Sequence, residues 1–232
     1  MTEEEISELG TPLHEEEEQD GNRWLLLMTI FYGLQFVVCL VLNFTLQLQT
    51  FRGLVTVDIV LALITFGFLY IIRGHLQTVL KWNGFSPLKI LMYGLLGIVA
   101  AIIVYYSVKW LNRNIFDKDV FYYNVFRPFA YPKIVMIALI ALYPAIIEEL
   151  AFRGILQEGL TRCIVPEHVV YVNAFLFAII HMSFISFFWL LPFAIWLGNV
   201  RLKEKTIWYG VLIHFCFNIT ACLYEFYELK LF

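Results

Sequence analysis

The sequence predicts an all-α membrane protein, a polytopic bundle of about seven transmembrane helices, or eight if one apolar run breaks in two. Two observations carry this prediction. The chain of 232 residues is 61% apolar and 18% aromatic, with a mean hydropathy of +0.76, whereas soluble domains are about 45–50% apolar. Successive apolar runs also approach the roughly 20 residues that an α-helix needs to cross a bilayer.

The apolar runs form two groups on either side of a polar connection. Three runs precede it, at residues 24–48, 54–72 and 88–111, and four follow it, at residues 133–161, 169–181, 183–200 and 206–224. The run at 133–161 is longer than a bilayer crossing, so we expect that helix to tilt or to extend into water. The run at 169–181 is short and predicts a helix that spans the membrane only in part.

These runs divide the chain into four parts. Residues 1–22 are acidic and lack helical periodicity, which is typical of a disordered tail. Residues 23–112 hold the first three membrane helices, and residues 113–130 form a polar connecting loop. Residues 131–226 form a membrane core, and the polar residues discussed below all lie in it.

Charge and cysteine content exclude several classes of function. The formal net charge of −3 comes from the acidic tail, and the remainder is net basic, as expected for a protein that contacts anionic lipid. No basic stripe or binding motif indicates nucleic acid. If the N-terminus lies inside, eight Lys and Arg residues fall on the inner side and seven on the outer side, with Arg153 not counted, so neither orientation is favoured. Four cysteines lack metal-ligand spacing and are predicted to be packing residues: Cys39, Cys163, Cys216 and Cys222.

Two adjacent glutamates, Glu148 and Glu149, interrupt the run at 133–161, and Arg153 follows one turn later. A charged side chain at the bilayer centre costs about 2.5–3.5 kcal/mol on insertion scales, so these residues predict a functional site. Residues four apart share a helix face, whereas neighbours diverge by about 100°. We therefore expect Glu149 to pair with Arg153 and Glu148 to remain free for chemistry.

Pro144 lies one turn before Glu148. Proline removes a backbone hydrogen bond and bends a membrane helix, which frees a carbonyl group and could open a wet pocket at the glutamates. A plain kink without a functional consequence is an equally good interpretation.

Two later apolar runs each carry a histidine, His181 and His214, and Asn218 follows one turn after the second. The side chains of His214 and Asn218 face the same point and can both donate hydrogen bonds, which suits the stabilisation of an oxyanion. A single histidine on an apolar helix is more often structural. Together with the glutamate pair, however, the two histidines favour an active site.

The polar residues resemble the three motifs of the CPBP intramembrane proteases. The motifs are Glu148-Glu149-x-x-x-Arg153, Phe177-x-x-x-His181 and His214-x-x-x-Asn218, in this order on successive helices. That family includes the type II CAAX prenyl endopeptidases and the Abi proteins linked to bacteriocin processing and self-immunity. The resemblance extends from about residue 133 to residue 224 and leaves the first three helices unassigned.

The resemblance implies a glutamate-dependent intramembrane endopeptidase that needs no metal or other cofactor. By analogy with the family, Glu148 and His181 would activate water, and His214 with Asn218 would hold the oxyanion. The supporting residues would be Glu149, Arg153 and Phe177, although a pure packing role for Phe177 is equally compatible with its place in the sequence.

Three other interpretations stay open on the sequence alone. A glutamate with two histidines is also a zinc-ligand set that leaves a position for water, although no His-Glu-x-x-His motif is present. A scaffold or bacteriocin-immunity protein could keep the polar cluster for folding. A transporter with a proton relay is weaker, because paired discontinuous helices are not indicated.

The expected partners are the lipid bilayer and a peptide or membrane-anchored (including lipid-anchored) protein substrate. Prenylated proteins, bacteriocin leaders, peptide pheromones and remnant signal peptides all suit a site at membrane depth. Small size and the lack of a eukaryotic targeting feature favour a bacterial plasma membrane, and the oligomeric state is not predicted.

Overall fold

A computed structural model describes residues 12–45, 50–82, 84–116 and 121–231. These residues form helices and no strand, which confirms the predicted all-α class. Six of the helices are long and apolar enough to cross a membrane, and a seventh apolar helix, α9 (Pro166–Ile180), is shorter. The outer surface of the bundle is apolar, with exposed residues such as Leu63, Phe66, Leu88 and Phe184, as expected for a protein surrounded by lipid.

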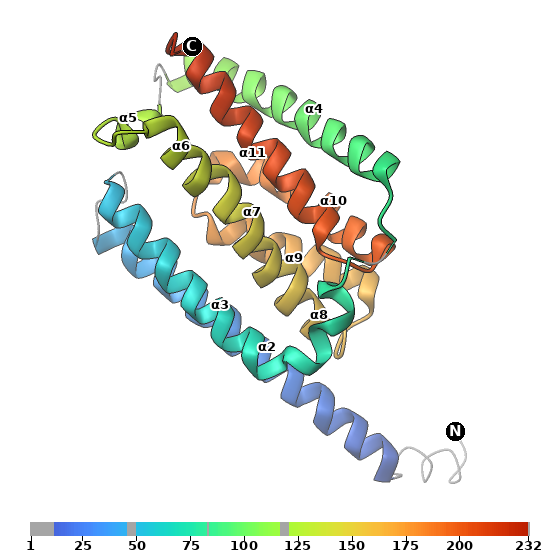
Figure 1. Cartoon of the computed structure of the whole chain (residues 1–232). Helices are drawn as coiled ribbons and strands as arrows, with labels where there is room; N and C mark the ends of the chain where they lie inside the picture. The colour runs from blue at the N-terminus through green and yellow to red at the C-terminus, as the bar shows by residue number, and fades with distance from the viewer. Residues whose placement is uncertain (1–11, 46–49, 83, 117–120, 232) are drawn as a thin grey trace.

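Helices α2 (Pro12–Thr45) and α3 (Phe51–Leu80) lie side by side on one side of the bundle (Figure 1). The start of α2 differs from the prediction, since residues 12–22 are helical rather than irregular. Glutamate and glutamine have good helix propensity, and proline is suited to the first helical turn. The remainder of the expected tail, residues 1–11, lies outside the described residues.

Helix α4 (Pro87–Leu111) packs along α11 (Trp208–Glu228) on the opposite side of the bundle (Figure 1). Gly97 permits this close approach, because a Cβ atom there would lie 2.8 Å from the carbonyl oxygen of Ile213. The first three membrane helices therefore do not form one packed unit, since α4 packs against the C-terminal part of the chain.

The described parts of the connection between the two groups of helices contain helical turns, which the prediction of a polar loop did not include. They hold a π-helical turn, η1 (Asn112–Phe116), and a short helix, α5 (Tyr123–Phe126). Tyr123 and Phe126 are buried, and the Tyr123 ring lies edge-on to Phe226 of α11 at 5.8 Å. These two aromatic side chains hold the connection on the bundle.

One central helix runs from Pro132 to Leu160 between these two sides (Figure 1). Its successive parts are α6 (Pro132–Met136), η2 (Ile137–Leu142), α7 (Tyr143–Glu148), η3 (Glu149–Leu156) and α8 (Gln157–Leu160). The two η parts are π-helical, a wider winding that is often found at functional sites. Before Pro144, the backbone N–H of Tyr143 bonds the carbonyl of Ala138, five residues back.

Helix α9 and helix α10 (Phe184–Glu204) pack against each other as a hairpin. Met182 has a left-handed backbone conformation with φ of 49°, and Ser183 caps the start of α10 through the backbone N–H of Ser186. His181 therefore lies at the tip of the hairpin. The prediction that the fifth apolar run makes a short helix agrees with the 15 residues of α9.

The start of α11 is fixed to the end of α3. The Thr206 hydroxyl lies within hydrogen-bond distance of the carbonyl oxygens of Val79 and Lys81, and the Trp208 indole N–H donates to Leu80. These bonds occupy carbonyls that the end of α3 leaves without helical partners. All four cysteines are free thiols.

Candidate active site

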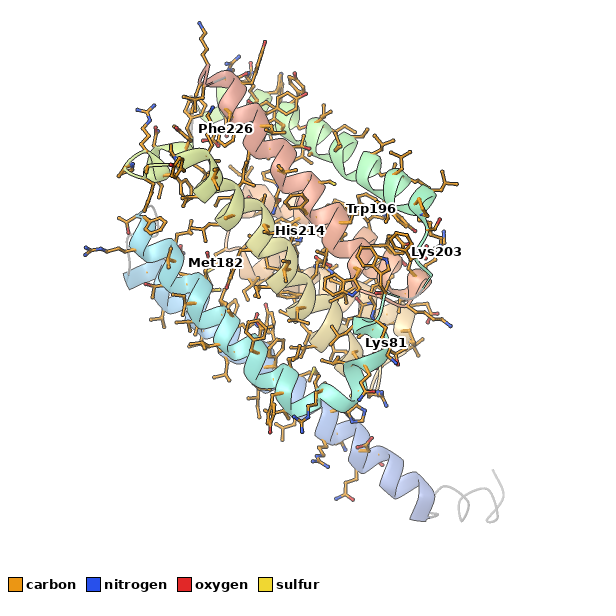
Figure 2. All side chains as sticks on the ribbon, in the orientation of Figure 1. Lys81, Met182, Trp196, Lys203, His214 and Phe226 are labelled. Carbon is orange, nitrogen blue, oxygen red and sulfur yellow. The ribbon has the colours of Figure 1, made fainter. Side chains whose placement is uncertain are left out.

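The structure brings Glu148, His181 and His214 together from α7, the end of α9 and α11. The Oε2 atom of Glu148 lies 4.0 Å from Nε2 of His181 and 3.9 Å from Nε2 of His214. Both distances are too long for direct hydrogen bonds. Figure 2 labels His214 midway along the bundle, between Phe226 toward one end and Lys81 and Lys203 toward the other.

Hydrogen bonds fix the orientation of both imidazoles. Nδ1 of His181 lies 2.7 Å from the carbonyl oxygen of Phe177, and Nδ1 of His214 lies 3.1 Å from Oε1 of Glu149. A carbonyl oxygen and an ionised carboxylate can only accept, so both Nδ1 atoms carry the hydrogen. Both rings therefore turn Nε2 toward Glu148.

Glu149 and Arg153 form the ion pair that their spacing predicts. Nη1 of Arg153 lies 2.8 Å from Oε1 of Glu149, and both side chains are fully buried. Arg153 also donates to the Ala194 carbonyl at 3.2 Å. The same Oε1 atom of Glu149 thus meets both the guanidinium and the His214 ring, which links the ion pair to the site.

Gly210 of α11 makes room for Glu149. A Cβ atom at this position would lie 2.8 Å from Oε2 of Glu149, closer than a carbon and an oxygen can approach without one of them moving. Oε2 is buried and has no hydrogen-bond partner among the described residues. The absence of a side chain at residue 210 therefore lets α11 bring His214 up to Glu149.

Phe177 is fully buried and packs between the groups it was predicted to support. Its ring centroid lies 4.7 Å from that of His181, and the Arg153 guanidinium lies 4.5 Å from it. The ring face of an aromatic side chain attracts a cation. Phe177 thus contacts the hairpin-tip histidine and the buried cation at the same time.

Asn218 makes a contact that the sequence did not predict. Its Nδ2 donates to the carbonyl oxygen of Ile140 at 3.1 Å. In an α-helix that carbonyl would accept from the N–H of residue 144, but Pro144 has no N–H. The Asn218 amide therefore supplies the Ile140 carbonyl with a donor that Pro144 cannot provide.

The site opens on one side into a pocket of about 170 Å³. The side chains of Glu148 and His181 are 31% and 30% exposed, whereas that of His214 is 6% exposed. The pocket lies between the glutamate helix and the pair α2 and α3. Its polar lining, apart from Glu148 and His181, consists of Gln35, Cys39, Asp58, Thr65 and Tyr143.

Asp58 of α3 lines this pocket, although the sequence analysis did not predict it as a site residue. Its backbone carbonyl accepts a hydrogen bond from the Tyr143 hydroxyl, and its Oδ2 atom is buried without a hydrogen-bond partner among the described residues. A signal was present, because Asp58 is the only charged residue in the apolar run at 54–72. A charged side chain within a membrane helix is costly in free energy, and this reason for expecting a function applies to Asp58 as it does to Glu148.

Within the described part of the chain, no three His, Cys, Asp or Glu side chains have the geometry to hold a metal ion.

Comparison with protein families finds one match. Residues 130–220 match the family model of the type II CAAX prenyl endopeptidase Rce1-like proteins. The matched segment contains Glu148, Glu149, Arg153 and both histidines, in agreement with the resemblance drawn from their motifs, whereas α2, α3 and α4 lie outside it. Comparisons with curated proteins and with solved structures find no match.

Proposed function

We propose that this chain, whose residues 130–220 belong to the type II CAAX prenyl endopeptidase Rce1-like family, is an intramembrane endopeptidase in which Glu148 activates water. The family supplies the reaction class, cleavage of a peptide bond in a membrane-associated protein. The assignment of the reaction to particular residues rests on the geometry of the site.

One observation carries the assignment, namely that both histidine Nε2 atoms face the same oxygen of Glu148 at 3.9 and 4.0 Å. A water molecule that donates a hydrogen bond to this oxygen is also close enough to the His181 ring to donate a second one. The neutral Nε2 atom of His181 accepts that hydrogen bond. Glu148 takes a proton as the water oxygen attacks the peptide carbonyl carbon. It then returns the proton to the leaving amine as the C–N bond breaks.

In this proposal, His214 and Asn218 stabilise the oxyanion by donating hydrogen bonds to it. His214 bonds Glu149 through Nδ1, and in this proposal a second proton on Nε2 makes that nitrogen a donor to the oxyanion. Asn218 has two amide hydrogens, of which one bonds Ile140, and we assign the other to the oxyanion. Each required role then has a residue of its own, so the proposed reaction proceeds without a metal.

The proposed substrate is a peptide or lipid-anchored protein that reaches the pocket from the bilayer, and the proposed location is a bacterial plasma membrane. The pocket borders α2 and α3, whose outer faces are apolar. In this proposal, a substrate held in lipid enters the pocket beside these two helices.

The test is cleavage by the purified protein in lipid nanodiscs, measured by mass spectrometry on an equimolar library of peptides. We expect Glu148→Gln and His181→Ala to lower cleavage by at least about 100-fold, the usual contribution of a general base. Glu167→Gln, which alters an exposed carboxylate on α9, is the matched control and should cleave like the wild type.

Two results would contradict the proposal. If Glu148→Gln cleaved peptides at the wild-type rate, Glu148 could not be the general base. If the wild type lost its activity after chelation and recovered it on addition of stoichiometric zinc, the activation of water would have to be assigned to a metal ion.

A further inference from the structure

The pocket beside Glu148 has a second carboxylate, and it comes from outside the matched segment. Asp58 lies on α3, whereas Glu148 and His181 lie within residues 130–220. The active-site groups and Asp58 thus lie in the same pocket, on walls contributed by different parts of the chain.

The position of Asp58 is fixed relative to the active site. The Tyr143 hydroxyl bonds the backbone carbonyl of Asp58, and Tyr143 begins the short helix α7 that ends at Glu148. On the same wall, the Gln35 amide donates to the Thr65 hydroxyl at 3.2 Å, so these two groups bond each other. Oδ2 of Asp58, by contrast, has no partner among the described residues.

The charge of the lining is one-sided. Its acidic groups are Asp58 and Glu148, and its other titratable groups are Cys39, Tyr143 and His181. No lysine or arginine is among the described lining residues, and the nearby Arg153 is paired with Glu149. A carboxylate oxygen shielded from water needs a counter-charge or a hydrogen-bond donor, and no described residue supplies one to Oδ2 of Asp58.

We infer that Asp58 recognises a basic side chain of the peptide substrate, a lysine or arginine close to the scissile bond. This inference rests on the proposed function and adds the class of substrate to it. The cation pairs with Asp58 while the neighbouring peptide bond lies at Glu148. A pocket with two carboxylates correspondingly rejects an acidic residue at that position.

The test uses three internally quenched peptides that differ at one residue, which is lysine, norleucine or glutamate. Norleucine matches the lysine stem without the charge, so the ratio of kcat/KM for the lysine and norleucine peptides isolates recognition of the cation. The peptides are derived from a sequence that the wild-type protein cleaves in the library, with the varied residue placed in turn at each of the three positions on either side of the cut.

At one of these positions we expect the wild type to prefer the lysine peptide over the norleucine peptide by at least about tenfold, and the glutamate peptide to be cleaved slowest. Asp58→Asn should bring the lysine-to-norleucine ratio close to one. Asp58→Lys should reverse the order of the lysine and glutamate peptides. Glu167→Gln is the control for an equivalent change outside the pocket and should keep the wild-type ratio.

The inference is overturned if Asp58→Asn keeps the wild-type ratio, or if the wild type shows no preference at any position. Binding of the same lysine and norleucine peptides to Glu148→Gln, measured by fluorescence anisotropy, separates this failure from failure of the proposed function. If no library peptide is cleaved, a panel of 12-residue apolar peptides with lysine or norleucine at the centre is used for binding alone. If the lysine peptides bind in an Asp58-dependent way but are not cleaved, the inference about Asp58 is supported and the proposed protease activity is contradicted. Equal binding of both kinds of peptide removes the inference.

Discussion

A single oxygen atom, Oε1 of Glu149, lies within hydrogen-bond distance of both Arg153 and His214. The buried ion pair is therefore part of the scaffold that orients the His214 ring of the candidate active site. Removal of either member of the pair affects more than the contact between the two, because the remaining charge is left in a region from which water is excluded.

We predict that Glu149→Gln and Arg153→Met each lower the free energy of unfolding by about 3–5 kcal/mol, because each leaves an uncompensated buried group. The double variant should lose less than the sum of the two. Thermal unfolding of the wild type, the two single variants and the double variant in detergent measures these losses of stability. Strict additivity would show that the two side chains are not coupled.

Gly210 offers a second test at the scale of a residue. Gly210→Ala places a methyl group 2.8 Å from Oε2 of Glu149, so the carboxylate must move away from His214. We expect a loss of about 1–3 kcal/mol in stability, typical of overpacking, together with a fall in kcat.

Gly94→Ala is the matched control for Gly210→Ala, because the nearest side-chain atom to its new methyl group is Cys216 Sγ at 3.7 Å, an ordinary contact. Equal effects of the two alanine substitutions on kcat would argue against a role of Gly210 in placing Glu149.

Pro144 of the central helix and Asn218 of α11 are connected through the carbonyl group of Ile140. Pro144 has no N–H to donate to the Ile140 carbonyl, and α11 provides a side-chain donor to it. The two π-helical parts flank the same short segment, α7, that carries Glu148. Irregular winding is thus concentrated where the glutamates must point into the bundle.

We predict that Asn218→Ala lowers stability by about 1 kcal/mol, the usual net value of a hydrogen bond. Adding Pro144→Ala should restore part of this loss, because residue 144 then supplies an N–H to Ile140. Asn199→Ala is the control, since its amide bonds a carbonyl within its own helix at an exposed position.

Measuring kcat in the same Asn218 variants separates the two roles of Asn218. If the double variant recovers stability but not turnover, Asn218 also acts on the reaction. If both recover together, its role is confined to the helix.

The sequence predicts features of the site that depend on spacing within one helix. Glu149 and Arg153 pair because residues four apart share a face, and this holds even through the π-helical part. The contact between Asn218 and Ile140 joins residues 78 apart and depends on how α11 packs, which no local pattern encodes. The helical start of α2 was mispredicted because a run of glutamates suits a helix and a disordered tail equally well.

For the whole molecule, the important boundary lies between the pair α2 and α3 and the remaining helices. The pocket lies along this boundary, so its shape depends on packing between segments far apart in the sequence. Hydrophobic patterning predicts that these helices exist, but it does not predict which of their faces meet. For this reason Asp58 was not assigned to the site in advance.

Cys39 lies on the α2 wall of the pocket, so chemical modification of its thiol can probe this boundary. We predict that N-ethylmaleimide abolishes most of the cleavage by the wild type, because the added group fills space beside Glu148. A Cys39→Ala variant, compared with its own untreated activity, should be resistant. Equal sensitivity of the two proteins would place the relevant thiol among Cys163, Cys216 and Cys222.

The location of the Glu149–Arg153 pair within a single helix also matters for biosynthesis. Glu149 is translated 65 residues before His214, so Arg153 is available to pair with it before α11 exists. At that stage the carboxylate already has its counter-charge four residues away, and the two enter lipid as a neutral unit, which is less costly than two separate ions. Construction of the site therefore begins inside one helix at the translocon and is completed only when α11 has been translated.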